Sequence, residues 1–381
     1  MPELKHFVLF ICIMLLVMPV AAIGEVTPTP APEVEEELPD DIDVDALIEE
    51  GLEDIQAGEF RSALAKMDIV IEADPAISTA YYIRGLAESQ LGMIDNAIED
   101  FSAAIELVPW RFDLHILRGD ANLANGSPID ALLDYDEAIR INPFAAEAYL
   151  RRSNIYFELD EDAAGDVDDL TARAMSDYSN GQLPEALAFL DEAIATGEGL
   201  DSIGMVYYLR GIVNLNIGDT DAVFEDYANA LEIDPDIHNV YLARGILYGQ
   251  QGNLKAAGRD FYNRITILGA ETVEEEMAIG DTVEYDMAYR RVIEVSFEAN
   301  AGQVITISAN EIGDTFVDPL ITVLDPDGQA IAGDDDSGDN FGSRLTDLEL
   351  PDDGTYTLMI SHAEGGRIFG FIGQIEVEIS E

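Results

Sequence analysis

Glycine returns along this chain at a fixed interval of 34 residues. Gly51, Gly85 and Gly119 are separated by this interval, and so are Gly211 and Gly245 later in the chain. Four other positions keep the interval: a second glycine (Gly58, Gly92, Gly126), an alanine (Ala63, Ala97, Ala131), a bulky side chain (Met67, Phe101, Tyr135) and a proline (Pro75, Pro109, Pro143). Because five positions agree, we expect an array of like structural units.

Each unit is predicted to be a pair of antiparallel helices. Apolar side chains recur at helical spacing on both sides of the second glycine, as Tyr82, Leu86 and Leu91 do before Gly92. Gly85 lacks a side chain, so the two helices can approach closely there, and a bulky residue such as Phe101 is expected to fill the space beside them. The proline at the end of each unit disfavours helix at the preceding residue, and the next unit begins there.

A charge reversal between units supports this pairing of helices. Arg84 is followed sixteen residues later by Asp100, and the same spacing joins four other pairs: Arg118 and Asp134, Arg152 and Asp168, Arg210 and Asp226, Arg244 and Asp260. In the first unit Glu50 is followed sixteen residues later by Lys66. The two positions are therefore expected to form ion pairs between the helices of a unit, worth about 0.2–1 kcal/mol each if exposed. The alternative is a row of arginines that captures an anion.

The pattern of Gly, Ala, aromatic residue and Pro resembles the tetratricopeptide repeat (TPR). The resemblance covers 44–271, with units that begin near Val44, Ser78, Phe112, Ala146, Val167, Gly204 and His238. Between Asp160 and Gly181 there is room for only one helix where a regular array needs two, so a break in the array is predicted near 160–180. The fold class implied for this part is an all-α superhelix of antiparallel helix hairpins.

Beyond Gly269 the apolar residues alternate, as expected for β-strands. Ile293, Val295 and Phe297 would share one face of a strand, and similar runs surround 305–308, 356–361 and 375–380. Seven to nine short strands of this kind indicate an all-β sandwich over 272–381. The segments AGQVITIS, DPLITVLDPDGQAIAGDDDSGDN and LPDDGTYTLMIS resemble the bacterial pre-peptidase C-terminal (PPC) domain. The resemblance implies an extracellular accessory domain, in some cases linked to calcium or polymer binding, and does not imply peptidase activity.

The N-terminus has the pattern of an export signal over 1–24, with Lys5 and His6, an apolar run and small residues near Ala22. A spacer rich in Pro and acidic residues follows over 25–43. The only cysteine, Cys12, lies in the signal, so a mature chain would have no disulfide and no thiol chemistry. An exported protein (extracellular, on the cell surface or periplasmic) is therefore expected.

The charge of the chain excludes two classes of partner. With 77 acidic and 19 basic residues the formal net charge is −58, which repels nucleic acid and anionic lipid. We therefore expect no nucleic acid as partner, and no membrane contact apart from the signal segment.

One Asp-rich run is a candidate calcium site. Asp334, Asp336 and Asp339 stand in an Asp-rich run with Ser and Gly, and calcium prefers several such oxygen ligands. The alternative is a loop whose aspartates accept hydrogen bonds from backbone amides. Metalloprotease, phosphate-binding and nucleophile motifs are missing from the sequence, so we expect no catalytic residues, no enzyme activity and no required cofactor, with calcium as an option.

By resemblance to the TPR family, the first helix of each unit lines a concave surface that binds a protein or peptide partner. Its exposed positions would be Tyr82, Leu86, Gln90, Ile116, Asp120, Leu123, Leu150, Asn154, Phe157, Tyr208, Ile212, Asn216, Leu242, Ile246 and Gln250. About half of these residues are expected to pack in the core instead. Lys66 and Lys255 are the only lysines of the mature chain. A basic or apolar ligand segment is therefore favoured over an acidic one.

The sequence thus predicts an exported, non-enzymatic scaffold that binds a partner through its repeats and carries an accessory β-sandwich. Two alternatives stay open. The sandwich could bind an extracellular polymer or polysaccharide while the repeats act as a spacer, or the protein could assist or inhibit a separate peptidase.

Overall fold

The computed structural model describes residues 43–269, 271–288, 291–313, 317–335, 337–338, 342–362 and 373–381. The chain divides into two units, Met1–Ile42 and Asp43–Glu381, and the structure below is that of the second. The predicted export signal and nearly all of the predicted spacer lie outside the described residues. In the part of the chain that the structure does describe, no helix is both long and apolar enough to span a membrane.

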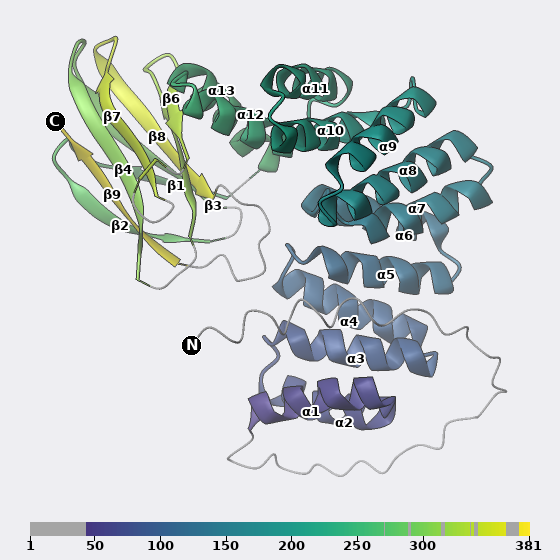
Figure 1. The fold of residues 1–381 in the computed structure, drawn as a ribbon. Coiled ribbons are helices and arrows are strands. Elements are labelled where there is room, and N and C mark those ends of the chain that lie inside the picture. Colours follow the sequence, from purple (N-terminus) through teal and green to yellow (C-terminus); the bar gives the residue numbers. More distant parts are fainter. Residues whose placement is uncertain are drawn as a thin grey trace. The chain divides into compact units, whose positions relative to one another are not determined.

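The described residues form thirteen helices followed by nine strands (Figure 1). The helices are α1 Val44–Ala57, α2 Phe60–Ala73, α3 Ser78–Leu91, α4 Ile94–Leu107, α5 Phe112–Ala124, α6 Pro128–Ile141, α7 Ala146–Glu158, α8 Asp162–Ser179, α9 Leu183–Thr196, α10 Ile203–Ile217, α11 Thr220–Ile233, α12 His238–Gln250 and α13 Leu254–Leu268. Successive helices pack against each other as hairpins, from α1 with α2 to α12 with α13. The predicted fold class of this part is confirmed.

The two glycine series have the two roles that a hairpin requires. The second series lies in the turns: Gly58, Gly92 and Gly218 end α1, α3 and α10 with positive φ, a conformation that favours glycine. The first series lies at the helix contact. A Cβ on Gly85 would stand 2.8 Å from the Phe101 ring, and one on Gly119 2.6 Å from the Tyr135 ring. The close approach predicted from the repeat is therefore confirmed.

The irregular stretch of the array contains one long helix. α8 spans eighteen residues and packs against both α7 and α9, so one helix serves as the second helix of one hairpin and the first helix of the next. The sequence has room for one helix here, and α8 is that helix. Val167, which was expected to lie near the start of a unit, is instead within α8, because the helix continues from Asp162 without a turn.

The strands form two sheets. They are β1 Glu271–Glu276, β2 Thr282–Met287, β3 Arg291–Ala299, β4 Val304–Ile312, β5 Pro319–Leu324, β6 Ala330–Asp334, β7 Ser343–Glu349, β8 Gly354–His362 and β9 Gly373–Ser380. One sheet has the order β1-β3-β8-β5-β6 and the other β2-β9-β4-β7. β1 pairs with β3 in parallel, and the other described pairs are antiparallel. Alternate residues such as Val295, Ile307, Leu358 and Val377 form the core of this part.

The last helix of the array packs on the sheet. α13 contacts β5 and β6, and its buried residues Phe261 and Ile265 share a cluster with Leu320 and Met359 of the strands. At Gly258 the helix backbone lies so close to β6 that a Cβ would overlap the main chain of Ala332. The repeats and the strands therefore share a continuous apolar contact.

Candidate functional site

The sixteen-residue charge pairs predicted from the sequence are all present. The guanidinium of Arg84 donates to both carboxylate oxygens of Asp100 at 2.8 Å. The other four Arg–Asp pairs have shortest distances of 2.5–2.7 Å, and Lys66 stands 3.1 Å from Glu50. In each Arg pair the aspartate is buried. The value for exposed pairs therefore does not apply to the Arg–Asp pairs, because their carboxylates lie between the two helices of each hairpin.

The arginines also connect neighbouring hairpins. Arg84 reaches back to Asp68 of α2 at 2.7 Å, and Arg152 to Asp136 of α6 at 2.6 Å. Arg118 donates to Ser102 of α4 at 3.2 Å. Each of these acceptors lies sixteen residues before its arginine. The guanidinium groups are thus occupied by the protein's own acceptors, which argues against an anion-binding row of arginines.

Burial and ion pairing compete at the aspartates. At Asp168 burial outweighs the attraction of Arg152 and raises the pKa of the carboxyl group. At Asp134 burial is overcome by His115, Arg118 and Asn122, so the pKa of that carboxyl group is lowered. These groups stabilise hairpins and are not free to bind a ligand.

The predicted partner-binding residues of α3 are partly covered. Tyr82 and Leu86 are half-buried and pack against the cluster formed by the first two hairpins, while Gln90 is exposed. The guanidinium of Arg111 lies 4.8 Å from the centre of the Tyr82 ring. This helix offers one amide and the edges of two apolar side chains.

On α5 the predicted residues interact mainly within the array. Ile116 is buried and Leu123 packs against the same core cluster. Asp120 accepts a hydrogen bond of 2.7 Å from the Tyr135 hydroxyl and lies 3.4 Å from Arg151. Partial burial raises the pKa of the Asp120 carboxyl group despite Arg151. Ile116 is therefore a core residue.

The three predicted residues of α7 are all exposed. Leu150 is 44 % exposed and Phe157 is 41 % exposed, and Asn154 lies between them on the same side of the helix. The Phe157 ring packs on Gly165, where a Cβ would stand 2.6 Å from it. We call Leu150, Asn154 and Phe157 the α7 stripe.

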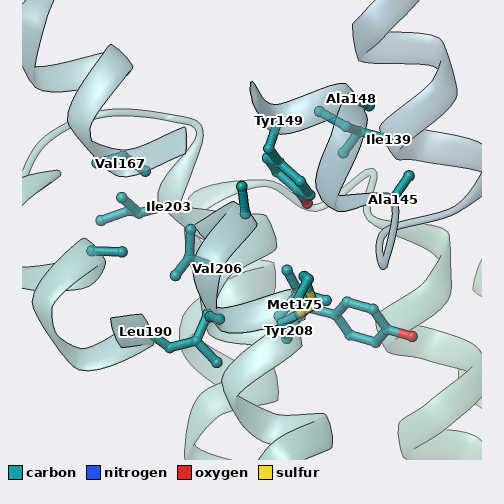
Figure 2. Packing of buried hydrophobic residues seen from close by; sticks show 14 of the residues in the cluster. Ile139, Ala145, Ala148, Tyr149, Val167, Met175, Leu190, Ile203, Val206 and Tyr208 are labelled. Atoms are coloured by element: carbon teal, nitrogen blue, oxygen red, sulfur yellow. The ribbon is translucent and has the colours of Figure 1, made fainter. Parts of the chain in front are cut away.

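The predicted apolar residues of α10 and α12 pack against the protein itself, while Asn216 and Gln250 are exposed. Tyr208 is buried in the cluster that also contains Tyr149 and Met175, which Figure 2 shows at close range, and it stacks on Tyr227. Ile212 packs against this cluster, and Asn216 donates to the Tyr178 hydroxyl at 3.3 Å and to the Ile212 carbonyl. Leu242 and Ile246 pack against the contact between α13 and the strands, and Gln250 is exposed. This part of the predicted surface is largely closed.

The calcium candidate is described only in part. Asp336 and Asp339 lie outside the described residues. Asp334 is buried at the end of β6, and its Oδ2 accepts hydrogen bonds from the Ser337 hydroxyl at 2.6 Å and from the Arg344 amide at 2.7 Å. Burial raises the pKa of this carboxyl group. Asp334 thus has the amide-capping role of the alternative, and among the described residues no three His, Cys, Asp or Glu side chains gather as a metal site.

Two residues of α13 were not singled out by the sequence reasoning. Arg264 is buried and donates to the His362 carbonyl of β8 at 2.8 Å, and Gly258 makes the contact with β6. Both break the repeat: other hairpins have Val70, Ala104, Ala138 and Ala230 where the last has Arg264, and Leu64, Ile98, Leu132 and Phe224 where it has Gly258. That departure is the signal by which they could have been found.

Comparisons with known proteins agree with both parts of the fold. Residues 48–109 match the sequence model of the tetratricopeptide repeat, and residues 295–362 match that of the bacterial pre-peptidase C-terminal domain. No curated protein is similar enough to this chain to count as a match.

Solved structures with partial similarity include proteins of both kinds. YrrB, described as a TPR protein with an unusual peptide-binding site, is 21 % identical with a TM-score of 0.29, covering 54 % of this chain and 93 % of its own. The first TPR of Spaghetti (RPAP3), bound to an HSP90 peptide, is 23 % identical with a TM-score of 0.30. The match covers 31 % of this chain and 93 % of that protein. The pre-peptidase C-terminal domain of Bacillus anthracis collagenase is 10 % identical with a TM-score of 0.24. The match covers 29 % of this chain and 98 % of that domain.

The helical part of the chain therefore contains a tetratricopeptide repeat match at 48–109, and the strands that follow contain a bacterial pre-peptidase C-terminal domain match at 295–362.

Proposed function

We propose that this protein is an exported scaffold without enzymatic activity, which binds a protein or peptide partner on the α7 stripe. The observation that carries the proposal is the exposure of Leu150 and Phe157; at the position of Leu150 the neighbouring first helices have Ile116 and Tyr208, which are buried. We include Gln90, which is exposed, and the half-buried Tyr82 and Leu86 of α3 in the proposed binding surface. Of the other predicted residues, Ile116 and Tyr208 are buried, and Asn216 and Gln250 are exposed.

The stripe has the chemistry of a peptide-binding surface. Complete burial of an exposed Leu or Phe side chain contributes about 1.5–3 kcal/mol, so the two apolar residues can anchor a partner. The Asn154 amide can both donate to and accept from a peptide backbone. The surface therefore suits a segment with apolar side chains and free backbone groups.

Charge selects the composition of the partner. A chain of net charge −58 attracts segments with Lys or Arg and repels acidic ones, an effect that acts mainly on association rate and decreases with salt. We therefore expect an apolar segment flanked by basic residues.

Export and the role of the C-terminal domain are part of the proposal. The apolar N-terminal run and the PPC match support an extracellular setting, in which the C-terminal domain contacts the envelope or another extracellular component. Binding of an extracellular polymer by this domain, with or without calcium, is the alternative, and assistance or inhibition of a separate peptidase is the third.

The test uses labelled peptides and the mature full-length chain. Peptides with two apolar residues flanked by lysines are compared with versions flanked by glutamates, using fluorescence anisotropy. The variant Leu150→Ser/Phe157→Ser removes both apolar anchors. The matched control is Ile129→Ser/Leu133→Ser, which removes two apolar side chains of α6 that are 61 % and 63 % exposed.

The proposal predicts that the basic peptides bind, that the α7 variant weakens binding at least tenfold, and that the α6 variant binds as the wild type does. Equal binding by all three proteins would show that the stripe is not the site. If no peptide binds and the full chain co-sediments with polysaccharide equally well in wild type and α7 variant, the polymer-binding alternative holds.

A further inference from the structure

Glu88 is a buried acidic residue in the second hairpin that the proposed function does not use. It lies on α3, is only 5 % exposed, and its Oε2 atom has no hydrogen-bond partner among the described residues. Glu88 interacts with the carboxyl group of Asp100, which stands twelve residues further on, as Asp134 does from Asn122, and which already accepts two hydrogen bonds from Arg84. Two carboxyl groups therefore lie side by side between α3 and α4.

Three other hairpins show a hydrogen-bonded pair at this position. Asn122 and Asn214 occupy the corresponding places, and each donates its amide hydrogen to the buried aspartate of its own hairpin, at 2.8 and 2.9 Å. In the first hairpin, where the charges are reversed, Asp54 accepts from Lys66 at 2.7 Å. A donor faces an acceptor in all three cases. Glu88 can satisfy the same rule only when its carboxyl group carries a proton.

The surrounding charges do not supply a second cation for Glu88. Arg84 is shared between Asp100 of α4 and Asp68 of α2, and Asn96 is the other polar side chain of α4 that interacts with Glu88. From α5, Arg118 reaches Ser102 and its own partner Asp134. One guanidinium thus faces three carboxyl groups, and full ionisation would leave a buried negative charge without compensation.

We propose that Glu88 is held as a neutral carboxylic acid that donates a hydrogen bond to Asp100, and that loss of this proton loosens the second hairpin. Burial, and then the charge of Asp100, raises the pKa of Glu88 from 4.5 to about 7. The folded state therefore binds more protons than the unfolded state between these two values. The contribution of Glu88 to stability is fully present below about pH 4.5 and is lost as the pH rises to about 7.

Glu88 lies on a helix that also carries residues of the surface assigned to partner binding. Tyr82, Leu86 and Gln90 are on α3, the helix that carries Glu88. If the proposed function holds, on which this step rests, a partner that contacts α3 is bound more weakly above neutral pH. The stability test below does not depend on any partner.

The test compares wild type with Glu88→Gln, which has a donor amide at every pH, as Asn122 and Asn214 have. Urea unfolding is followed from pH 4.5 to 8.5 by the fluorescence of Trp110, the only tryptophan, which lies three residues after the end of α4. The ratio of the unfolding constants, wild type over variant, should rise by up to about tenfold per pH unit between about pH 5 and 7 and then level off. A constant ratio over the whole range would overturn the proposal.

A second measurement needs no variant. The carboxyl carbon of Glu88 in the folded wild type, followed by NMR with labelled glutamate, should titrate near neutral pH. A midpoint close to that of an exposed glutamate would show that Glu88 is ionised in the folded protein at neutral pH, and the proposal would fail even if Glu88→Gln did not fold.

Discussion

At the scale of single residues, the array is held by charges buried between helices. Asp168 is 1 % exposed and forms a two-point contact with Arg152, which also reaches Asp136. The pairing could be predicted from spacing, because both partners recur with the repeat. The burial could not, since it depends on which side of each helix meets the next hairpin.

Removal of the arginine from one of these ion pairs should lower the free energy of unfolding, because the aspartate stays buried without a cation. Arg152→Met leaves Asp168 without a cation, so we expect the free energy of unfolding to fall by about 3–5 kcal/mol. The control is Arg173→Met, whose partner Asp169 is on the surface, with an expected loss below about 1 kcal/mol. Urea denaturation measures both, and equal small losses would contradict the structure.

Two glycines of one helix provide a matched test of the hairpin contact. A Cβ on Gly245 would overlap the Phe261 ring, whereas Gly249 in the same helix has open space and an ordinary helical φ. Gly245→Ala should therefore destabilise the protein by about 1–3 kcal/mol. Gly249→Ala should be neutral or stabilise it by up to about 1 kcal/mol. Similar thermal shifts in the two variants would mean that the helices do not approach closely at Gly245.

At the scale of elements, the regular hairpins could be predicted from the sequence and the closed surface could not. Hairpin geometry follows from local spacing, which glycines and apolar residues reveal. Tyr208 and Ile212 are covered because α8 takes part in two hairpins and brings residues far apart in sequence into one cluster. The sequence showed room for only one helix between Asp160 and Gly181, but the effect of that helix on its neighbours depends on tertiary packing.

The contact between α13 and β6 is the second feature of this scale that a repeat pattern does not show. Gly258→Ala places a Cβ against the main chain of Ala332, which cannot move aside as a side chain can. We expect a loss of at least about 2 kcal/mol in the free energy of unfolding. The loss should be seen both when unfolding of the helices is followed and when unfolding of the strands is followed. A loss confined to one signal would show that the two parts are not coupled through this contact.

At the scale of the whole molecule, residues 43–381 form one unit in which the last repeat lies against the β-sheet. Separate expression of repeats and strands would expose Leu320, Leu324 and Met359 on one side and Phe261 and Ile265 on the other. Functional tests therefore use the full chain. The two parts were recognisable separately from the sequence, because each has its own periodicity, while their contact rests on Gly258 and Arg264, which depart from the repeat.

Partner binding on the α7 stripe is the central claim, and hydrogen exchange tests it most directly. The mature full-length chain is measured alone and with a saturating lysine-flanked apolar peptide. Binding on the α7 stripe predicts slower amide exchange in α7 and α3 and unchanged exchange in α10 and the strands, with the effect lost in Leu150→Ser/Phe157→Ser. Protection confined to the strands, or unchanged in that variant, would contradict it.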